Sequence, residues 1–283
     1  MPELPEVETV RRGLEQRTSG MTIARVEILR QRAIAAPPDP ELFALALRDT
    51  RVSRWRRRGK YLLADLDQGA DGESAGQWGV HLRMTGQFLW LDNNQPPCRH
   101  TRVRIWSLEG PELRFVDTRS FGQMWWVPQG TPTEAVITGL ARLGPEPFSE
   151  AFTAEYLQQR LQRSSRPIKT ALLDQSLVAG VGNIYADESL FAAGIRPHIP
   201  SQQLGLNQLH RLRQALVEVL EISIGAGGTT FSDFRDLTGT NGNYGGVAWV
   251  YRRSGQDCRR CGTPIRRDRL GGRSSHWCPT CQS

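Results

Sequence analysis

Four cysteines near the end of the chain have a spacing that could hold a metal ion. Cys258-x2-Cys261 and Cys278-x2-Cys281 are separated by sixteen residues. Each pair can come from one tight turn, and two such turns can close a tetrahedron of thiolates around one structural zinc ion. Two disulfides or an iron-sulfur cluster are the alternatives; disulfides are rare in a reducing compartment, and a cluster is less usual at this spacing. The spacing favours zinc, and the fifth cysteine, Cys98, is expected to be a free thiol.

The basic residues are almost all arginine. Of 36 lysines and arginines, only Lys60 and Lys169 are lysine. GC-rich coding would replace lysine wherever charge alone is needed. A surviving lysine can also mark a place that needs a compact ammonium able to release its proton, which a guanidinium cannot do. Composition alone leaves both interpretations open for each lysine.

The charge distribution points to an anionic partner. The net charge is +7, although many basic proteins bind nothing acidic. Six cations and no acid lie in residues 51–60, and eight arginines lie in residues 252–283 against two aspartates. Two basic clusters far apart in the sequence predict one long surface that faces nucleic acid.

These residues must be positioned by folded elements, and the N-terminal part of the chain predicts one helix followed by strands. Leu4, Val7, Val10 and Leu14 form the apolar stripe of a helix over residues 3–17. The segments after it are short, β-rich and broken by turns, so they predict a sandwich or barrel. The expected strands cover residues 22–29, 60–66, 88–91, 102–106 and 113–116, while residues 68–77 are small and polar and predict a flexible hairpin loop.

The C-terminal half has helical periodicity. The expected helices cover residues 155–163, 167–173, 184–193 and 208–224, and a glycine-rich stretch, 238–246, precedes the cysteines. We therefore expect an α+β chain with a catalytic β-rich domain (1–130), a linker (131–150), a helical domain (151–240) and a metal-binding tail (241–283). No run approaches the roughly 18 apolar residues of a membrane helix, and the start lacks a signal-peptide pattern, so a soluble cytoplasmic protein is expected.

Eight short motifs occur in an order that resembles one protein family. They are MPELPEVETVRRGL, RRRGKYLL, HLRMTG, DTRSFG, LGPEP, GVGNIYADESLFAAGI, GGTT and the final four-cysteine segment. Together they span essentially the whole chain, which resembles bacterial formamidopyrimidine-DNA glycosylase. The resemblance implies an N-terminal helix with a β-sandwich or barrel, a helix-two-turn-helix domain and a zinc-finger hairpin. It also implies a monomeric DNA-repair enzyme that excises oxidised purines, such as 8-oxoguanine and formamidopyrimidines, from double-stranded DNA, cuts abasic sites and needs no organic cofactor.

The resemblance assigns the chemistry to four residues. Pro2 becomes the nucleophile once Met1 is removed, which suits an α-amine with a pKa near ~7.7–8. Glu3 acts as general acid/base, although an acid there could equally favour a helix N-terminus. Lys60 and Arg273 contact phosphates, and Arg273 assists elimination; by itself Arg273 would be one more solvated arginine.

The resemblance also assigns residues that extrude the damaged nucleotide and bind DNA. A base inside a duplex must be flipped out, so other groups must fill the vacated stack. Met84, Arg119 and Phe121 match this filling set, with Arg119 placed to hydrogen-bond the orphaned cytosine. Met84 and Phe121 could instead be core residues. The resemblance further implies that His100 and Asn183 bind phosphates and that Lys169 is a basic residue that contacts DNA.

This chain differs from the family pattern in one segment, and two alternative functions compete with the one that the resemblance implies. Relatives often have a run of lysines where this chain has Arg163-Ser164-Ser165-Arg166, so a contact at Ser165 is in doubt. Endonuclease VIII shares the fold and chemistry but prefers oxidised pyrimidines, and its sequence usually has glycine where this chain has Leu4. A DNA-binding module without catalysis would lack Pro2, Glu3 or Lys60, and all are present.

Overall fold

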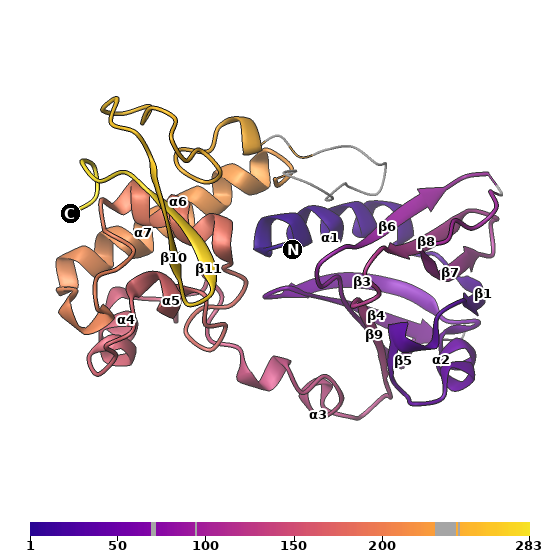
Figure 1. Cartoon of the computed structure of the whole chain (residues 1–283). Coiled ribbons are helices and arrows are strands. Elements are labelled where there is room, and N and C mark those ends of the chain that lie inside the picture. Colours follow the sequence, from indigo (N-terminus) through magenta and orange to yellow (C-terminus); the bar gives the residue numbers. More distant parts are fainter. Residues whose placement is uncertain (69–71, 94, 230–241, 243) are drawn as a thin grey trace. The chain divides into compact units, whose positions relative to one another are not determined.

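The computed structural model describes residues 1–68, 72–93, 95–229, 242 and 244–283 (Figure 1). It divides into two compact units, one of residues 1–141 with 227–243 and one of residues 142–226 with 244–283. The four-part division expected from the sequence stays a prediction. Among the described helices, none is long and apolar enough to cross a membrane.

The first unit consists of α1 (Leu4–Thr18), two β-sheets and two short helices. One sheet has the order β1-β7-β8-β6 and the other β2-β9-β5-β4-β3, and all pairs are antiparallel except β2 with β9. The strands are β1 (Ile23–Ile28), β2 (Ile34–Ala36), β3 (Arg51–Arg58), β4 (Tyr61–Gln68), β5 (Glu73–His81), β6 (Gly86–Leu91), β7 (Thr101–Ser107), β8 (Glu112–Asp117) and β9 (Gln123–Val127). The short helices are α2 (Pro40–Leu47) and α3 (Thr133–Val136), and η1 (Gln31–Ala33) and η2 (Leu140–Arg142) are single 3-10 turns.

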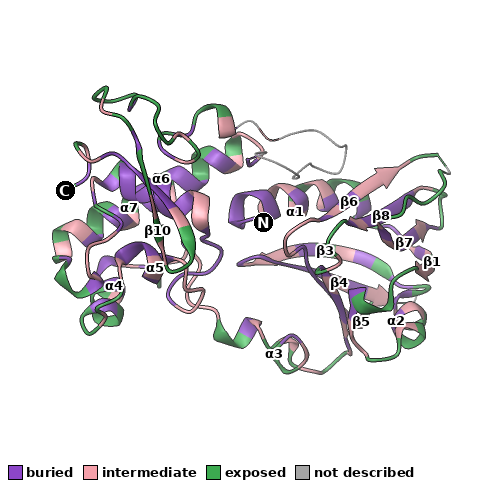
Figure 2. Ribbon diagram, in the orientation of Figure 1, coloured by how far each residue is buried: buried purple, intermediate pink, exposed green. Residues whose placement is uncertain are grey.

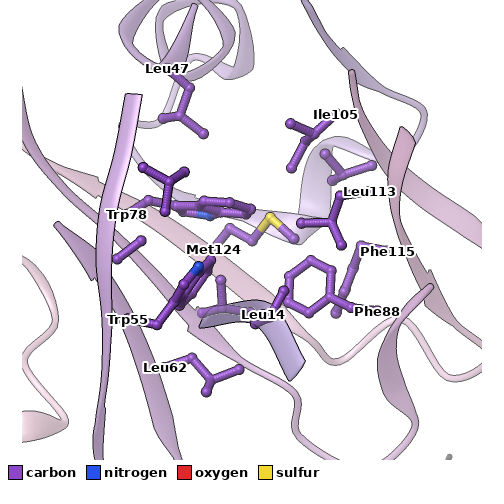
Figure 3. Close-up of a cluster of buried hydrophobic side chains, with 14 of the residues drawn as sticks. Leu14, Leu47, Trp55, Leu62, Trp78, Phe88, Ile105, Leu113, Phe115 and Met124 are labelled. Atoms are coloured by element: carbon purple, nitrogen blue, oxygen red, sulfur yellow. The ribbon is translucent and has the colours of Figure 1, made fainter. Parts of the chain in front are cut away.

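A single core joins α1 to both sheets. Leu14 of α1 packs with Trp55 of β3, Trp78 of β5 and Phe88 of β6, all at most 1% exposed (Figure 3). The rings of Trp55 and Trp78 meet edge to face with centroids 5.2 Å apart. The amphipathic stripe of the first helix therefore packs as predicted, and the N-terminal segment rests on a well-packed support.

Several strand assignments differ from the sequence analysis, in which β2, β3, β5 and β9 were not among the expected strands. Of the segment 68–77 that was expected to be a loop, Gln68 belongs to β4 and residues 73–77 belong to β5. The first basic cluster lies largely in β3, which the sequence analysis did not identify as a strand. Val52 and Trp55 point into the core between its arginines, and the frequent charges hide this pattern in the sequence.

The second unit is helical and ends in a two-stranded hairpin. Its helices are α4 (Ala154–Leu161), α5 (Ile168–Leu172), α6 (Asn183–Ala193) and α7 (Leu206–Gly225), with single turns η3 (Ser201–Gln203) and η4 (Tyr244–Gly246). Figure 2 shows α6 buried along most of its length, and it contacts α5, α7 and the hairpin. The hairpin is formed by β10 (Arg266–Leu270) and β11 (Arg273–Trp277). The expected α+β fold with a terminal hairpin is confirmed; most of the glycine-rich stretch 238–246 lies outside the described residues.

Candidate active site and DNA-binding residues

The N-terminal residues are held at the start of α1. Pro2 is buried, and Glu3 is the N-cap residue with only 3% of its surface exposed. The Glu6 carboxylate accepts hydrogen bonds from the backbone N–H of Glu3 (2.8 Å) and of Thr229 (2.8 Å). Glu6 therefore anchors the residue that follows Pro2, while Glu3 combines a helix-capping position with a place beside the proline.

Lys60 lies in the tight turn between β3 and β4, and is 6% exposed. Gly59 before it has φ +55°, a left-handed conformation that glycine adopts without strain. Arg57, at the end of β3, pairs with Glu8 of α1 at 3.1 Å and donates to the Gly59 carbonyl. Burial would raise the pKa of Glu8, but hydrogen bonds and charges from Arg11, Arg12 and Arg57 hold it below its usual range. This ion pair ties the Lys60 turn to the helix that carries Glu3.

Part of the first basic cluster is therefore used inside the protein. Arg57 is bound to Glu8, and Arg56 makes a two-pronged ion pair with Asp65 at 2.6 and 3.0 Å. These two guanidiniums are satisfied by carboxylates in the structure as it stands. Two of the six cations of residues 51–60 therefore have carboxylate partners within the protein.

The loop that carries Met84 is fixed by a neutral histidine. Burial, together with the charges of Arg83 and Lys60, lowers the pKa of His81 to about 3. The uncharged ring can therefore accept at Nδ1 from the backbone N–H of Arg83 (2.9 Å). Arg83 has φ +55°, so this bond holds a strained residue next to half-buried Met84.

Asp117, which the sequence analysis did not single out, joins the Met84 loop to the Arg119–Phe121 loop. Its carboxylate is 1% exposed and accepts from the Thr85 hydroxyl and from the backbone N–H of Arg119 (3.2 Å) and Gly122 (2.7 Å). The only local signal in the sequence is an aspartate two residues before Arg119, where such side chains often accept from a turn.

The two loops and the first residue of the chain line one cavity of about 390 Å³. Its lining residues are Met1, Arg32, Arg83, Met84, Ser120, Phe121 and Gln123. The Phe121 ring is 39% exposed and has the guanidiniums of Arg119 and Arg32 at 5.0 and 5.6 Å from its centroid. Phe121 and Met84 are therefore not core residues, and both lie beside the N-terminus. Arg32 comes from a distant segment and has no motif that would have indicated it.

Replacing Asp117 with alanine should loosen both loops. The change leaves the Thr85 hydroxyl and the Gly122 N–H without this acceptor, whereas the Arg119 N–H keeps the Thr85 hydroxyl at 3.0 Å. Each buried or half-buried donor left in this way costs about 1–3 kcal/mol. We expect the free energy of unfolding to fall by at least about 2 kcal/mol in urea titrations. Asp92→Ala is the matched control, because this exposed carboxylate accepts one exposed bond from Trp90; its loss should cost less than about 1 kcal/mol. Equal stability of the two variants would contradict a joining role for Asp117.

His100 is half-buried, directly precedes β7 and lies between two arginines. Its Nε2 accepts from Arg99 Nε (2.9 Å), and Nδ1 is 3.4 Å from Arg102 Nη2. Arg102 in turn donates to the Asp117 carbonyl at 2.8 Å. His100 is thus part of a cationic group that could meet phosphate.

In the second unit, Asn183 contacts the residue that follows Arg273. Asn183 is the first residue of α6, where backbone N–H groups and the helix dipole favour an anion. Arg273 is exposed and follows the Gly271-Gly272 turn, whose φ values of +53° and +78° favour glycine. Asn183 Nδ2 lies 3.3 Å from the hydroxyl of Ser274, the residue after Arg273.

Lys169 corrects a sequence-based expectation. It was expected to contact DNA, but its side chain is 0% exposed and its Nζ lies 2.6 Å from Asp187 Oδ1. An ammonium enclosed in this way presents no surface to a phosphate, so we do not place it in the DNA interface.

The four cysteines form a metal site. Their sulfurs all lie within 4.8 Å of one another, with Cys258 and Cys281 at 3.9 Å and Cys261 and Cys278 at 3.5 Å. Zinc–sulfur bonds of about 2.3 Å in a tetrahedron require sulfurs roughly 3.8 Å apart. The donor set therefore suits one zinc ion, whereas Cys98 is exposed and free.

Comparisons with known proteins agree with this arrangement. Family profiles match the formamidopyrimidine-DNA glycosylase N-terminal domain over residues 1–124, its H2TH domain over 143–235, and a zinc finger found in FPG and IleRS over 255–283. A formamidopyrimidine-DNA glycosylase of Parasynechococcus marenigrum is 67% identical over 282 residues and covers 100% of both chains.

Solved structures extend the comparison to three dimensions. Lactococcus lactis Fpg in complex with Fapy-dG-containing DNA has a TM-score of 0.88 at 32% identity, covering 99% of this chain and 100% of that one. The same protein with DNA containing an abasic site has a TM-score of 0.88 at 32% identity, with 99% of each chain covered. The expected family and zinc finger are confirmed: the chain belongs to the formamidopyrimidine-DNA glycosylase family.

Proposed function

We propose that this chain is a bifunctional DNA glycosylase and AP lyase that removes oxidised purines, 8-oxoguanine and formamidopyrimidines, from double-stranded DNA. One observation carries the proposal: the residue before Pro2 and the two apolar side chains Met84 and Phe121 line the same cavity. A nucleophile beside the groups that replace a flipped base is what chemistry on an extruded nucleotide requires.

Pro2 would act as the nucleophile. Once Met1 is removed, its neutral amine attacks C1′, and the electron pair of the glycosidic bond leaves with the base, which takes up a proton. Opening of the sugar ring gives an iminium that joins C1′ to the proline nitrogen. This cation accepts electrons when the C2′ proton is removed and the 3′ phosphate leaves, and a second elimination then releases the 5′ phosphate.

The other predicted residues have places that support defined roles. Glu3, nearly buried next to Pro2, would deliver and remove protons at the opening sugar. Lys60 would hold a phosphate of the damaged nucleotide, with its turn secured by the Arg57–Glu8 pair. Met84 and Phe121 would fill the stack and Arg119 would bond the orphaned cytosine. His100, Asn183 and Arg273 would bind phosphates, which fixes the register of the duplex.

The metal would serve structure and not chemistry. Cys258, Cys261, Cys278 and Cys281 would hold one zinc ion, which keeps the hairpin folded around Arg273. We further propose that the enzyme works as a monomer in the bacterial cytoplasm, where the chromosome is accessible.

The trapping experiment uses methionine-processed protein, a duplex with 8-oxoguanine opposite cytosine, and borohydride. Hydride reduces the iminium to a stable amine, so we expect a covalent protein–DNA adduct that peptide mapping places on Pro2. Protein that retains Met1 is the control and should give no adduct. A sugar found on Lys60 would overturn the assignment, and a preference for oxidised pyrimidines would favour the endonuclease VIII alternative.

A further inference from the structure

A buried ion pair in the second unit lies directly behind the proposed phosphate-binding arginine. Lys169 of α5 and Asp187 of α6 are 0% and 1% exposed, and Lys169 Nζ lies 2.6 Å from Asp187 Oδ1. The same ammonium donates to the backbone carbonyl of Ser274. Taking two charges out of water is costly unless each is fully bonded. The bonds this pair makes therefore indicate what it positions.

Asp187 binds the two residues that follow Ser274. Its Oδ2 accepts from the backbone N–H of His276 (2.9 Å) and lies 3.0 Å from His276 Nδ1. Its Oδ1 accepts from the hydroxyl of Ser275 at 3.3 Å. The pair thus engages three consecutive residues of β11, immediately after Arg273.

The other side of Arg273 is also held by α5. A Cβ added to Gly271, two residues before Arg273, would come within 3.3 Å of the Thr170 side chain, so the turn lies close to that residue. The exposed Arg273 therefore lies in a short segment that has Thr170 near one side and is bonded by Lys169 on the other.

Helix α6, which carries Asp187, also carries Asn183 one turn before it. Residues four apart lie on one face of a helix, and here both contact β11, Asn183 through the Ser274 hydroxyl at 3.3 Å. The start of α6 and the tip of the hairpin are consequently locked in one arrangement.

We infer that the Lys169–Asp187 pair is a positioning element for Arg273: it sets the separation between Arg273 and the N-terminus of α6, so that both can bind the same DNA backbone. The inference rests on the proposed function, in which Arg273 binds phosphate. It also accounts for a lysine in an arginine-dominated chain, because a compact ammonium fits a closed site that a planar guanidinium would overfill.

A double-mutant cycle tests this inference in zinc-loaded protein. Lys169→Met and Arg273→Ala are made singly and together, and two quantities are measured: the rate of strand cleavage at an abasic site, and the Kd for a duplex with a tetrahydrofuran abasic analogue. In the parent protein we expect Lys169→Met to lower the cleavage rate and to raise the Kd by about tenfold each. When Arg273 is already alanine, we expect each change to be less than about twofold. A merely stabilising residue would have the same effect in both backgrounds.

Glu188→Gln is the matched control. Glu188 is buried next to Asp187 on α6, but its carboxylate accepts from the backbone of Trp249, Val250 and Tyr251 and not from the hairpin. Any effect of this change should be equal with and without Arg273. Zinc content and thermal unfolding show whether each variant is folded; if Lys169→Met is not, Lys169→Met with Asp187→Leu replaces the pair by apolar groups and enters the same cycle.

The outcomes separate the inference from the proposed function. Equal effects of the Lys169 change in both backgrounds, or no effect in folded parent protein, would overturn the inference. If the unmutated protein binds the duplex but excises no oxidised purine, the proposed function is wrong. The Kd values of the double-mutant cycle would still decide the role of Lys169.

Discussion

Glu3→Gln should lower the rate of base excision by about 100- to 10,000-fold and leave affinity for damaged duplex nearly unchanged. Glutamine has the size of glutamate and can occupy the same nearly buried position, but its amide cannot act as an acid or a base toward the opening sugar. Single-turnover kinetics with 8-oxoguanine duplex measure the excision rate, and titration of a non-cleavable analogue measures affinity.

Phe121→Ala is the complementary variant and should reduce recognition of the damaged base more than the chemistry at the sugar. The exposed ring lies in the cavity beside the N-terminus, where it would offset lost base stacking worth a few kcal/mol. Alanine should impair capture of the lesion while cleavage of a preformed abasic site continues at a similar rate. Excision at the parent rate by Glu3→Gln, or equal loss of both activities in folded Phe121→Ala, would refute this division of roles.

Removing zinc should unfold the C-terminal hairpin and abolish cleavage. Structural zinc sites of this kind contribute about 10–16 kcal/mol of apparent binding free energy, and a segment this small has little other core. Elemental analysis of active protein should give one zinc per chain, and a strong chelator should remove zinc and activity together.

Two cysteine variants separate the metal site from general thiol chemistry. Cys261→Ala removes one of the four sulfurs and should lose zinc and cleavage. Cys98→Ala alters the free, exposed thiol and should retain both. Iron in place of zinc, or full activity without metal, would rule out a structural zinc finger.

Sequence alone identified the features that depend on near neighbours along the chain. The first helix follows from the stripe of Leu4, Val7, Val10 and Leu14, because helical periodicity is a local property. The metal site follows from two Cys-x2-Cys pairs, because each pair needs only one turn. The family resemblance also rested on short motifs, each of which lies within one segment of the chain.

Tertiary structure decided which charged residues face inward. Lys169 has the appearance of a DNA contact in the sequence, yet it is enclosed by Asp187 and Ser274, which lie 18 and 105 residues away. Asp117 joins two loops through Thr85, 32 residues before it. A buried charge needs a partner that satisfies it, and where that partner comes from another segment the sequence does not show which segments meet. Local patterns therefore determined the first helix and the metal ligands, while long-range pairing determined which polar groups are enclosed and which support the loops of the candidate site.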